Sequence, residues 1–242
     1  MIRLFIGSSA NGEDATIEAA YLNSIEKHAS EEVDVVFMRQ THNPKSFWHG
    51  WACDTWPTPF SGYRWGIAEY CNFEGRAIYT DCDMINYRDF KELMEINMEG
   101  KPLAARKGKR FGGHEFCVTV IDCAAYQEHA IPVRRLKTMS QMHQRHIAKF
   151  SGNDDLVHEL DPRWNVLDGE DYDLSEIYQL HFTNMATQPW TPGWFTGQTQ
   201  PHPRTDVVEE YERALDEARG NGYNPEDLVP SVPFGSYDII GR

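Results

Sequence analysis

The first forty residues alternate between short apolar runs and polar loops in the order strand, helix, strand. Residues 2–6 form an apolar run that predicts a buried strand. After the polar loop 7–12, apolar residues recur at helical spacing over 17–25, and residues 33–37 predict a second strand. This unit favours a parallel sheet that is buried on both faces. Ligands bind outside the carboxyl ends of such strands, so we expect the loop 7–12 to lie at a binding edge.

Apolar runs and helical patterns continue along the rest of the chain. Residues 41–62 are irregular and rich in proline and tryptophan, and a helix is predicted from Tyr63 to about Asn72. Strands are predicted within 75–85, 103–105, 116–121 and 177–182, and helices at 89–94, 138–149 and 206–219. The last helix is amphipathic and either covers the core or mediates a homodimer. The tail after Gly222 contains prolines and is predicted to be extended.

The composition supports one α/β domain and argues against several classes of protein. Of 242 residues, 40% are hydrophobic and 25% are charged, which excludes a collagen, a coiled coil or a wholly disordered chain. The formal net charge of −14 repels phosphate backbones and anionic membranes, so we expect no nucleic-acid partner. We find neither an apolar run long enough for a transmembrane segment nor a secretory signal. The five cysteines form no C-x-x-C pair, so a reduced, cytoplasmic protein is predicted.

Two aspartates, Asp81 and Asp83, close the apolar run within 75–85. Alternate side chains of an extended strand share a face, so both carboxylates are predicted to point the same way, with Cys82 on the opposite face. Like charges on one face repel each other. A bound Mg²⁺ or Mn²⁺ removes this repulsion and keeps coordination positions for phosphate. The alternative is an ordinary solvated strand end that carries two aspartates.

The segments around this pair resemble a known enzyme family. A D-x-D strand end at 73–84 is followed by an acidic, leucine-containing helix start at 89–93, and residues 58–65 contain a threonine–arginine helix start. Residues 160–165 end in Trp-Asn, and residues 181–190 begin with histidine and end in Pro-Trp. In this order, over about residues 1–200, they resemble the family 8 glycosyltransferases, the group of glycogenin and the bacterial lipopolysaccharide galactosyltransferases. The combination is specific, although no single segment is.

The resemblance implies a GT-A fold with a mostly parallel central sheet flanked by helices. Residues 1–200 would form the glycosyltransferase domain, and residues 201–242 a C-terminal helix and extended tail packed on it. A sugar would pass from a nucleotide-sugar, in the first place a UDP-sugar, to an acceptor hydroxyl with retention of configuration. By the same resemblance, Asp81, Asp83 and His181 would bind Mn²⁺ or Mg²⁺. The implied donor-binding residues are Ile6, Gly7, Ser8, Ser9, Arg64, Asp81, Asp83, Gln188 and Trp190.

Some positions depart from the family pattern. Asn184 replaces the glycine of the histidine-containing signature, and Gln188 stands where a lysine normally contacts the diphosphate. A substitute cation could come from the basic cluster Lys107, Lys109 and Arg110, for which a solvated surface turn is the alternative.

Other polar residues are weaker candidates. Glu115 and Asp122 flank a predicted strand and are candidate catalytic or sugar-contacting acids, with ordinary strand-end roles as the alternative. His143 and His146 are predicted to share a solvent-facing side of a helix.

Two other functions stay open. The first is a sugar-phosphate nucleotidyltransferase of related sheet architecture, which usually has a basic glycine-rich loop after the first strand, whereas residues 7–9 carry no basic side chain. The second is a non-catalytic carbohydrate-binding protein on a degenerate transferase fold, which the missing lysine favours. We find no P-loop, G-x-G-x-x-G, H-E-x-x-H or G-x-S-x-G motif, which argues against ATPases, Rossmann dehydrogenases, zinc peptidases and α/β-hydrolases.

Overall fold

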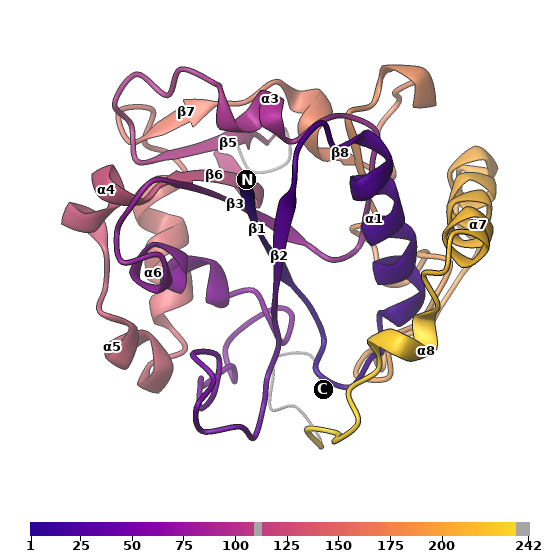
Figure 1. Ribbon diagram of the computed structural model, residues 1–242, viewed down its shortest axis with the longest axis horizontal. Coiled ribbons are helices and arrows are strands. Elements are labelled where there is room, and N and C mark those ends of the chain that lie inside the picture. The colour runs from indigo at the N-terminus through magenta and orange to yellow at the C-terminus, as the bar shows by residue number, and fades with distance from the viewer. Residues whose placement is uncertain (109–112, 236–242) are drawn as a thin grey trace.

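A six-stranded mixed sheet forms the centre of the molecule. The computed structural model describes residues 1–108 and 113–235 (Figure 1). The strands are β1 (Ile2–Gly7), β2 (Val33–Met38), β3 (Arg76–Asp81), β5 (Leu103–Lys107), β6 (His114–Asp122) and β7 (Val157–Glu159). Their order is β2-β1-β3-β6-β5-β7. The β1–β2, β1–β3 and β5–β7 pairs are parallel, whereas β6 is antiparallel to both of its neighbours. The predicted α/β architecture with a mostly parallel sheet is confirmed.

A second, smaller sheet was not foreseen from the sequence. It contains β4 (Met84–Asn86), β8 (Val166–Leu167) and β9 (Gln179–His181) in the order β4-β9-β8. The single strand predicted within 75–85 is therefore wrong in one respect: the chain bends at Cys82 and Asp83 and enters this second sheet. Both halves are buried and apolar, so the hydrophobic pattern contains no sign of the break.

Helices lie on both sides of the central sheet. They are α1 (Ala15–His28), α2 (Ile67–Tyr70), α3 (Lys91–Met94), α4 (Cys123–Tyr126), α5 (Val133–Thr138), α6 (Met142–Phe150), α7 (Thr205–Gly220) and α8 (Pro225–Leu228). Figure 1 shows α1 and α7 on one side of β1 and β2, and α4, α5 and α6 on the other. Short 3₁₀ turns occur at Tyr63–Gly66, Gln127–His129, Pro162–Asn165 and Leu174–Glu176. The helix predicted at 138–149 forms as α6, which begins four residues later, whereas α5 just before it was not predicted.

The C-terminal helix α7 packs along α1. Val207, Tyr211 and Leu215 of α7 belong to the same buried apolar cluster as Ile17 of α1, and the Tyr211 hydroxyl donates to Oγ1 of Thr16 at 2.9 Å. The apolar face predicted for residues 206–219 thus covers the core. The chain beyond it is not simply extended, because α8 forms and the following residues turn back across the ends of β1 and β2.

An aromatic cluster holds the irregular segment 41–62 in place. Trp56 is almost completely buried, packs edge-on against Trp51 and Tyr63, and donates from Nε1 to the Ser140 carbonyl at 3.1 Å. A Cβ atom added at Gly62 would overlap the Trp56 indole ring. Glycine at this position therefore lets the aromatic cluster pack directly against the chain just before Arg64.

We expect Gly62→Ala to lower the free energy of unfolding by about 1–3 kcal/mol, because a packed indole cannot move aside without strain. Gly152→Ala is the matched control, since an added Cβ there meets no atom within 4 Å. Urea unfolding of both variants measures the difference. Equal stability of the two variants would contradict this account of Gly62.

Candidate active site

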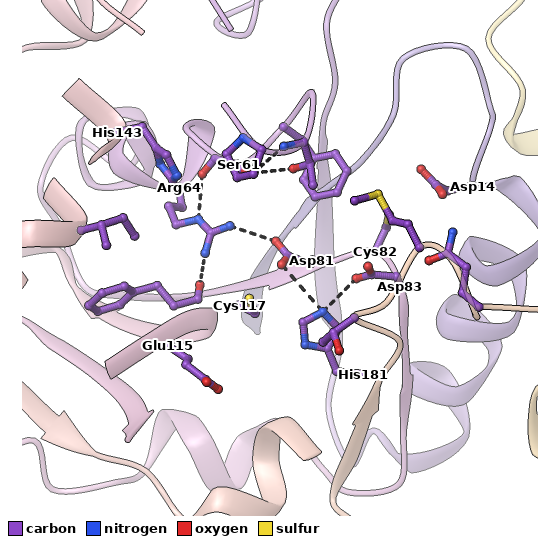
Figure 2. A pocket seen from close by; sticks show the side chains of 18 of the residues that line it. Asp14, Ser61, Arg64, Asp81, Cys82, Asp83, Glu115, Cys117, His143 and His181 are labelled. Carbon is purple, nitrogen blue, oxygen red and sulfur yellow. Dashed lines mark hydrogen bonds and ion pairs between the residues drawn. The ribbon is translucent and has the colours of Figure 1, made fainter. Parts of the chain in front are cut away.

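A cavity of about 460 Å³ opens where β3 ends. Its wall includes Asp81, Cys82 and Asp83 at the carboxyl end of β3, residues 114–117 of β6, and His143 and Ile147 of α6. Asp14, Arg64, the loop 57–61 and residues 181–194 complete it. Figure 2 shows acidic and histidine side chains from these separate segments facing one another across the cavity. The cavity thus lies at the carboxyl end of β3, the sheet edge at which ligand was expected to bind.

The carboxylates of Asp81 and Asp83 converge on one histidine. Nε2 of His181, on β9, lies 3.9 Å from Oδ2 of Asp81 and 3.3 Å from Oδ1 of Asp83 (Figure 2). The prediction that the two carboxylates share one face of a strand, with Cys82 on the other, is wrong. The strand β3 ends at Asp81, the chain bends before Asp83, and Cys82 lines the same cavity. Pairing of β4 with β9 instead sets His181 opposite Met84 and so beside the bend.

The other ring nitrogen of His181 is held by an amide. Nδ1 donates to Oδ1 of Asn165 at 2.8 Å, so the neutral ring has its lone pair on Nε2, the atom that faces the two aspartates. A hydrogen bond of this kind orients a metal-binding histidine and increases its basicity. Asn165 ends the Trp-Asn segment noted in the sequence, but no role was assigned to it there. Only the fold brings it to His181.

Asp81 has a fixed cationic partner in Arg64, at 3.1 Å, whereas it is His181 that opposes the charge of Asp83. Burial raises the pKa of Asp83, against the opposing effect of His181, and Oδ1 of Asp83 is buried without a hydrogen-bond partner among the residues that the structure describes. Burial alone would lower the pKa of His181, yet the charges of Asp83 and Asp81 raise it. Two hard oxygen donors and an imidazole are a suitable set for Mn²⁺ or Mg²⁺. The residues present therefore fit a divalent cation.

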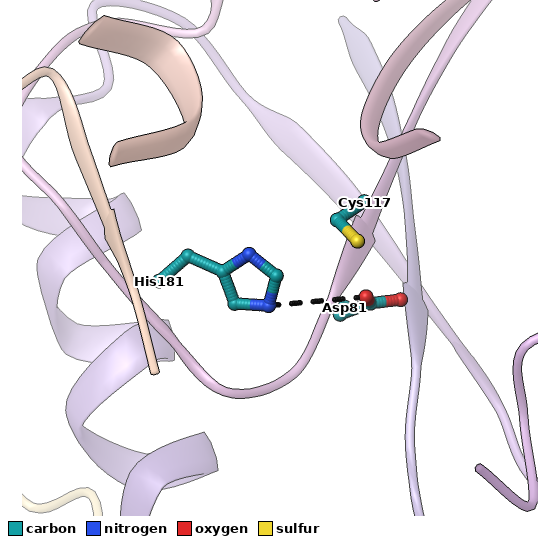
Figure 3. Close-up of side chains that lie close together, drawn as sticks. All are labelled: Asp81, Cys117 and His181. Atoms are coloured by element: carbon teal, nitrogen blue, oxygen red, sulfur yellow. Dashed lines mark ion pairs between the residues drawn. The ribbon is translucent and has the colours of Figure 1, made fainter. Parts of the chain in front are cut away.

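Cys117 is a neighbour of this cluster that was missed in the sequence. Its Sγ, a carboxylate oxygen of Asp81 and a ring nitrogen of His181 all lie within 4.8 Å of one another (Figure 3). Burial, with the charge of Asp81, holds the pKa of the Cys117 thiol well above its usual range. A neutral thiol is a poor ligand, so the hard donors dominate the chemistry of the cluster.

Arg64 is buried beside the carboxylate cluster. Its Nη2 donates to Oδ1 of Asp81 at 3.1 Å and to the Tyr79 hydroxyl at 2.9 Å. Nε donates to the Ser61 carbonyl at 2.8 Å, and Nη1 donates to the Phe116 carbonyl. These bonds fix a cationic group in the cavity wall, between Asp81 and α6 (Figure 2).

The four residues at the end of β1 that were predicted to bind the donor do not line the cavity. Ile6 and Gly7 end the strand, Ser8 and Ser9 follow it, and all four are buried. The Ser8 hydroxyl donates to Glu18, whereas the Ser9 hydroxyl donates to Asp14. A second cavity, of about 350 Å³, begins at Ala10 and is bounded by residues 39–43 and by the C-terminal tail.

Gln188 and Trp190 take different positions. Gln188 lines the main cavity, as expected from its place in the histidine-containing signature. Trp190 instead stacks on Tyr211 of α7 and donates from Nε1 to Asp14 at 2.9 Å, so it supports the cavity wall from behind. Trp194 is the tryptophan that lines the cavity, and its Nε1 donates to the Ser9 hydroxyl at 2.9 Å.

The remaining acidic and basic candidates are mostly engaged elsewhere. Glu115 lines the cavity and pairs with Nε of the buried Arg106 at 2.9 Å. Asp122 caps α4, where it accepts from the Ala125 amide at 3.1 Å. Lys107 is exposed and pairs with Asp154 at 2.9 Å. The rest of the predicted basic cluster, Lys109 and Arg110, lies outside the described residues.

The prediction that His143 and His146 face solvent is wrong. Both are buried, and the ring of Trp65 packs against both of them. The helical spacing placed them correctly on one face, but histidine side chains alone did not indicate whether that face was covered.

Comparison with known proteins gives a consistent result at the level of the fold. No protein-family model matches the chain, and no curated protein matches it in sequence. Solved structures, in contrast, superpose over nearly the whole chain.

Within residues 1–108 and 113–235, no helix combines the length and apolar character that crossing a membrane requires.

Three glycosyltransferases are among the solved structures that match the chain. The bifunctional glycosyltransferase WbbM matches with a TM-score of 0.61 and 12% identity, over 92% of this chain and 52% of its own. The glycosyltransferase GlyE of Streptococcus pneumoniae TIGR4 matches at 0.59 and 16%, over 98% and 66%. The galactosyltransferase LgtC, in complex with donor and acceptor sugar analogs, matches at 0.58 and 10%, over 96% and 98%.

The chain thus spans about half of WbbM, about two thirds of GlyE and nearly all of LgtC. Identities of 10–16% establish likeness of fold alone. The expected architecture is confirmed: this chain has the GT-A fold of the glycosyltransferases that it resembles.

Proposed function

We propose that the protein is a metal-dependent glycosyltransferase that transfers a sugar from a UDP-sugar to an acceptor hydroxyl with retention of configuration. The observation that carries this proposal is the convergence of Asp81, Asp83 and His181 at the carboxyl end of β3, inside the main cavity of a GT-A fold. LgtC binds donor and acceptor sugar analogs, and our chain covers 98% of that protein, which supports the same substrate classes here.

Asp81, Asp83 and His181 would hold the cation, with Asn165 orienting the histidine ring. When bound, the metal supplies Lewis acidity that stabilises negative charge on a nucleoside diphosphate leaving group. The chain's own residues bind and position the donor. Arg64 presents a fixed positive charge beside Asp81, and Gln188 lines the same cavity. The end of β1 and the loop after it would hold the nucleoside, partly through backbone groups.

Positioning and electrostatics carry most of the catalysis in this proposal. The carboxylate of Glu115 is paired with Arg106, so it is held in place as a neighbour of the sugar rather than freed as a nucleophile. The acceptor hydroxyl would give its proton to the departing phosphate. The acceptor itself is a hydroxyl-bearing compound, in the first place a glycan.

Thermal unfolding with UDP, with Mn²⁺ and with both tests the donor site. A ligand at about a hundred times its Kd stabilises the folded state by roughly 2.7 kcal/mol, which raises the Tm of a chain of this size by about 5–10 °C. We expect that rise only with UDP and Mn²⁺ together. Asp83→Asn should abolish it, whereas Asp216→Asn, the same change at an exposed site on α7, should retain it.

The contrary outcomes separate the alternatives. A parent protein that shows no rise with UDP, whether Mn²⁺ or Mg²⁺ is present, would contradict the proposal. A rise with glycans that is indifferent to metal and to UDP would favour a carbohydrate-binding protein. Release of pyrophosphate from a nucleoside triphosphate and a sugar phosphate would instead favour a nucleotidyltransferase.

A further inference from the structure

His143 lies in the cavity wall at the first turn of α6. Its ring is buried against Trp56 and Trp65, with centroid distances of 6.2 and 6.3 Å. It still lines the cavity, on the far side of Arg64 from Asp81 (Figure 2). Neither the metal cluster nor the donor-binding residues give this histidine a role.

A tryptophan fixes the tautomer of this histidine. Nε1 of Trp65 lies 3.0 Å from Nδ1 of His143, and an indole N–H is only a donor. Nδ1 must therefore accept, and in the neutral ring the proton resides on Nε2. Within the described chain, Nε2 of His143 makes no hydrogen bond.

The environment keeps the ring neutral. Burial, the charge of Arg64 and the nearby His146 together lower the pKa of His143 to about 3. At ordinary pH the cavity wall therefore contains an uncharged N–H donor whose orientation is set by a buried partner. Such a donor suits a neutral oxygen, such as a hydroxyl, better than a phosphate, which prefers cationic partners.

We infer that Nε2–H of His143 donates a hydrogen bond to a hydroxyl of the donor sugar and thereby determines which sugar is accepted. The inference rests on the proposed function. A donor whose diphosphate lies at Asp81 and Asp83 would extend its sugar past Arg64, and His143 is the polar group beyond it on α6. Around it, Phe116 and Ile147 are apolar, so one directed hydrogen bond there has a large influence on selectivity.

Selectivity among deoxy donors tests this role. The donor is whichever of UDP-glucose, UDP-galactose and UDP-N-acetylglucosamine the parent hydrolyses fastest with Mn²⁺, and kcat/KM is compared with that of its singly deoxygenated forms. We expect the parent to prefer the complete sugar over one deoxy form by about 10- to 100-fold. His143→Phe should abolish that single preference, and His143→Gln, which keeps an acceptor for Trp65 and an N–H donor, should restore part of it.

His146→Phe is the matched control. His146 lies on the same face of α6 and packs against Trp65, but it is not part of the cavity wall, so the preference should persist. The rise in Tm with UDP and Mn²⁺ should survive in His143→Phe, which shows that the fold and the nucleotide site are intact. If that rise is absent in the parent, the proposed function fails, and this inference fails with it.

Two results would overturn the inference while leaving the proposed function intact. One is a uniform loss of kcat/KM in His143→Phe for the complete sugar and for every deoxy form, because that indicates a structural role.

The other comes from nitrogen NMR of ¹⁵N-histidine-labelled protein. We expect His143 to be protonated on Nε2 alone throughout pH 5–8, with its signal moving on addition of the UDP-sugar and Mg²⁺ but not of UDP and Mg²⁺. A proton on Nδ1, or a signal indifferent to the sugar, overturns it.

Discussion

Arg64→Met is expected to lower the free energy of unfolding by about 3–5 kcal/mol, the usual cost of removing one partner from a buried ion pair. The guanidinium is 6% exposed and donates to Asp81, to Tyr79 and to two backbone carbonyls. Methionine fills much of the same volume, but it leaves the Asp81 carboxylate and the Phe116 carbonyl without this donor. The loss therefore comes from unpaired buried groups more than from an empty space.

Urea unfolding checks this value. Arg88→Met is the control, because Arg88 is 46% exposed and its pair with the equally exposed Glu92 contributes at most about 1 kcal/mol. A double substitution at Arg64 and Asp81 should cost less than the sum of the two single ones, since each removes the other's partner. Similar small losses in Arg64→Met and Arg88→Met would refute the structural role of Arg64.

The contribution of Glu18 to the free energy of unfolding is expected to fall by an amount on the order of 3 kcal/mol as the pH rises from about 4.5 to 7. Burial raises the pKa of Glu18 to about 7, against the opposing effects of Arg39 and Ser8. The folded state therefore keeps a proton that the unfolded state releases at lower pH. Stability from this group is complete below the unfolded pKa and is lost as the pH passes through the folded one.

The unfolding free energies of the parent and of Glu18→Gln, measured in urea at several pH values between 4 and 8, isolate this contribution. Other acids affect both proteins alike, so the difference between the two curves reports Glu18. We expect the free energy of unfolding of Glu18→Gln, relative to that of the parent, to rise steadily above pH 4.5 and to level off above pH 7. A difference that does not vary with pH would show that Glu18 has the same pKa in the folded and unfolded protein, which would contradict this account.

The sequence indicated the central elements because their signals are local. A short apolar run, a polar loop and a helical pattern occupy the first forty residues, and β1, α1 and β2 form there as predicted. The bend after Asp81 was not predictable in this way. Residues on both sides of it are equally apolar, and only pairing with β9 assigns Met84–Asn86 to a second sheet.

The site residues were recognised where a motif contained them and missed where packing alone brings them in. Asp81, Asp83 and His181 stand in recognisable segments, and the structure brings all three together. Cys117 and Asn165 reach the same cluster from β6 and from a 3₁₀ turn, so no spacing in the sequence links them to it. His143 was misjudged because the tryptophans that bury it come from residues 56 and 65, far from α6 in sequence.

The loop after β1 is held by residues near the other end of the described chain. Trp190 donates to Asp14, Trp194 donates to Ser9, and Asn11 bonds to the backbone of Phe234 and Gly235. These contacts join positions 176 to 224 residues apart. Contacts of such high sequence separation form slowly, because a long loop must close first. During synthesis β1 is made early, but the residues that hold its loop are made nearly two hundred residues later. We therefore expect the cavity to be among the last parts of the molecule to become ordered.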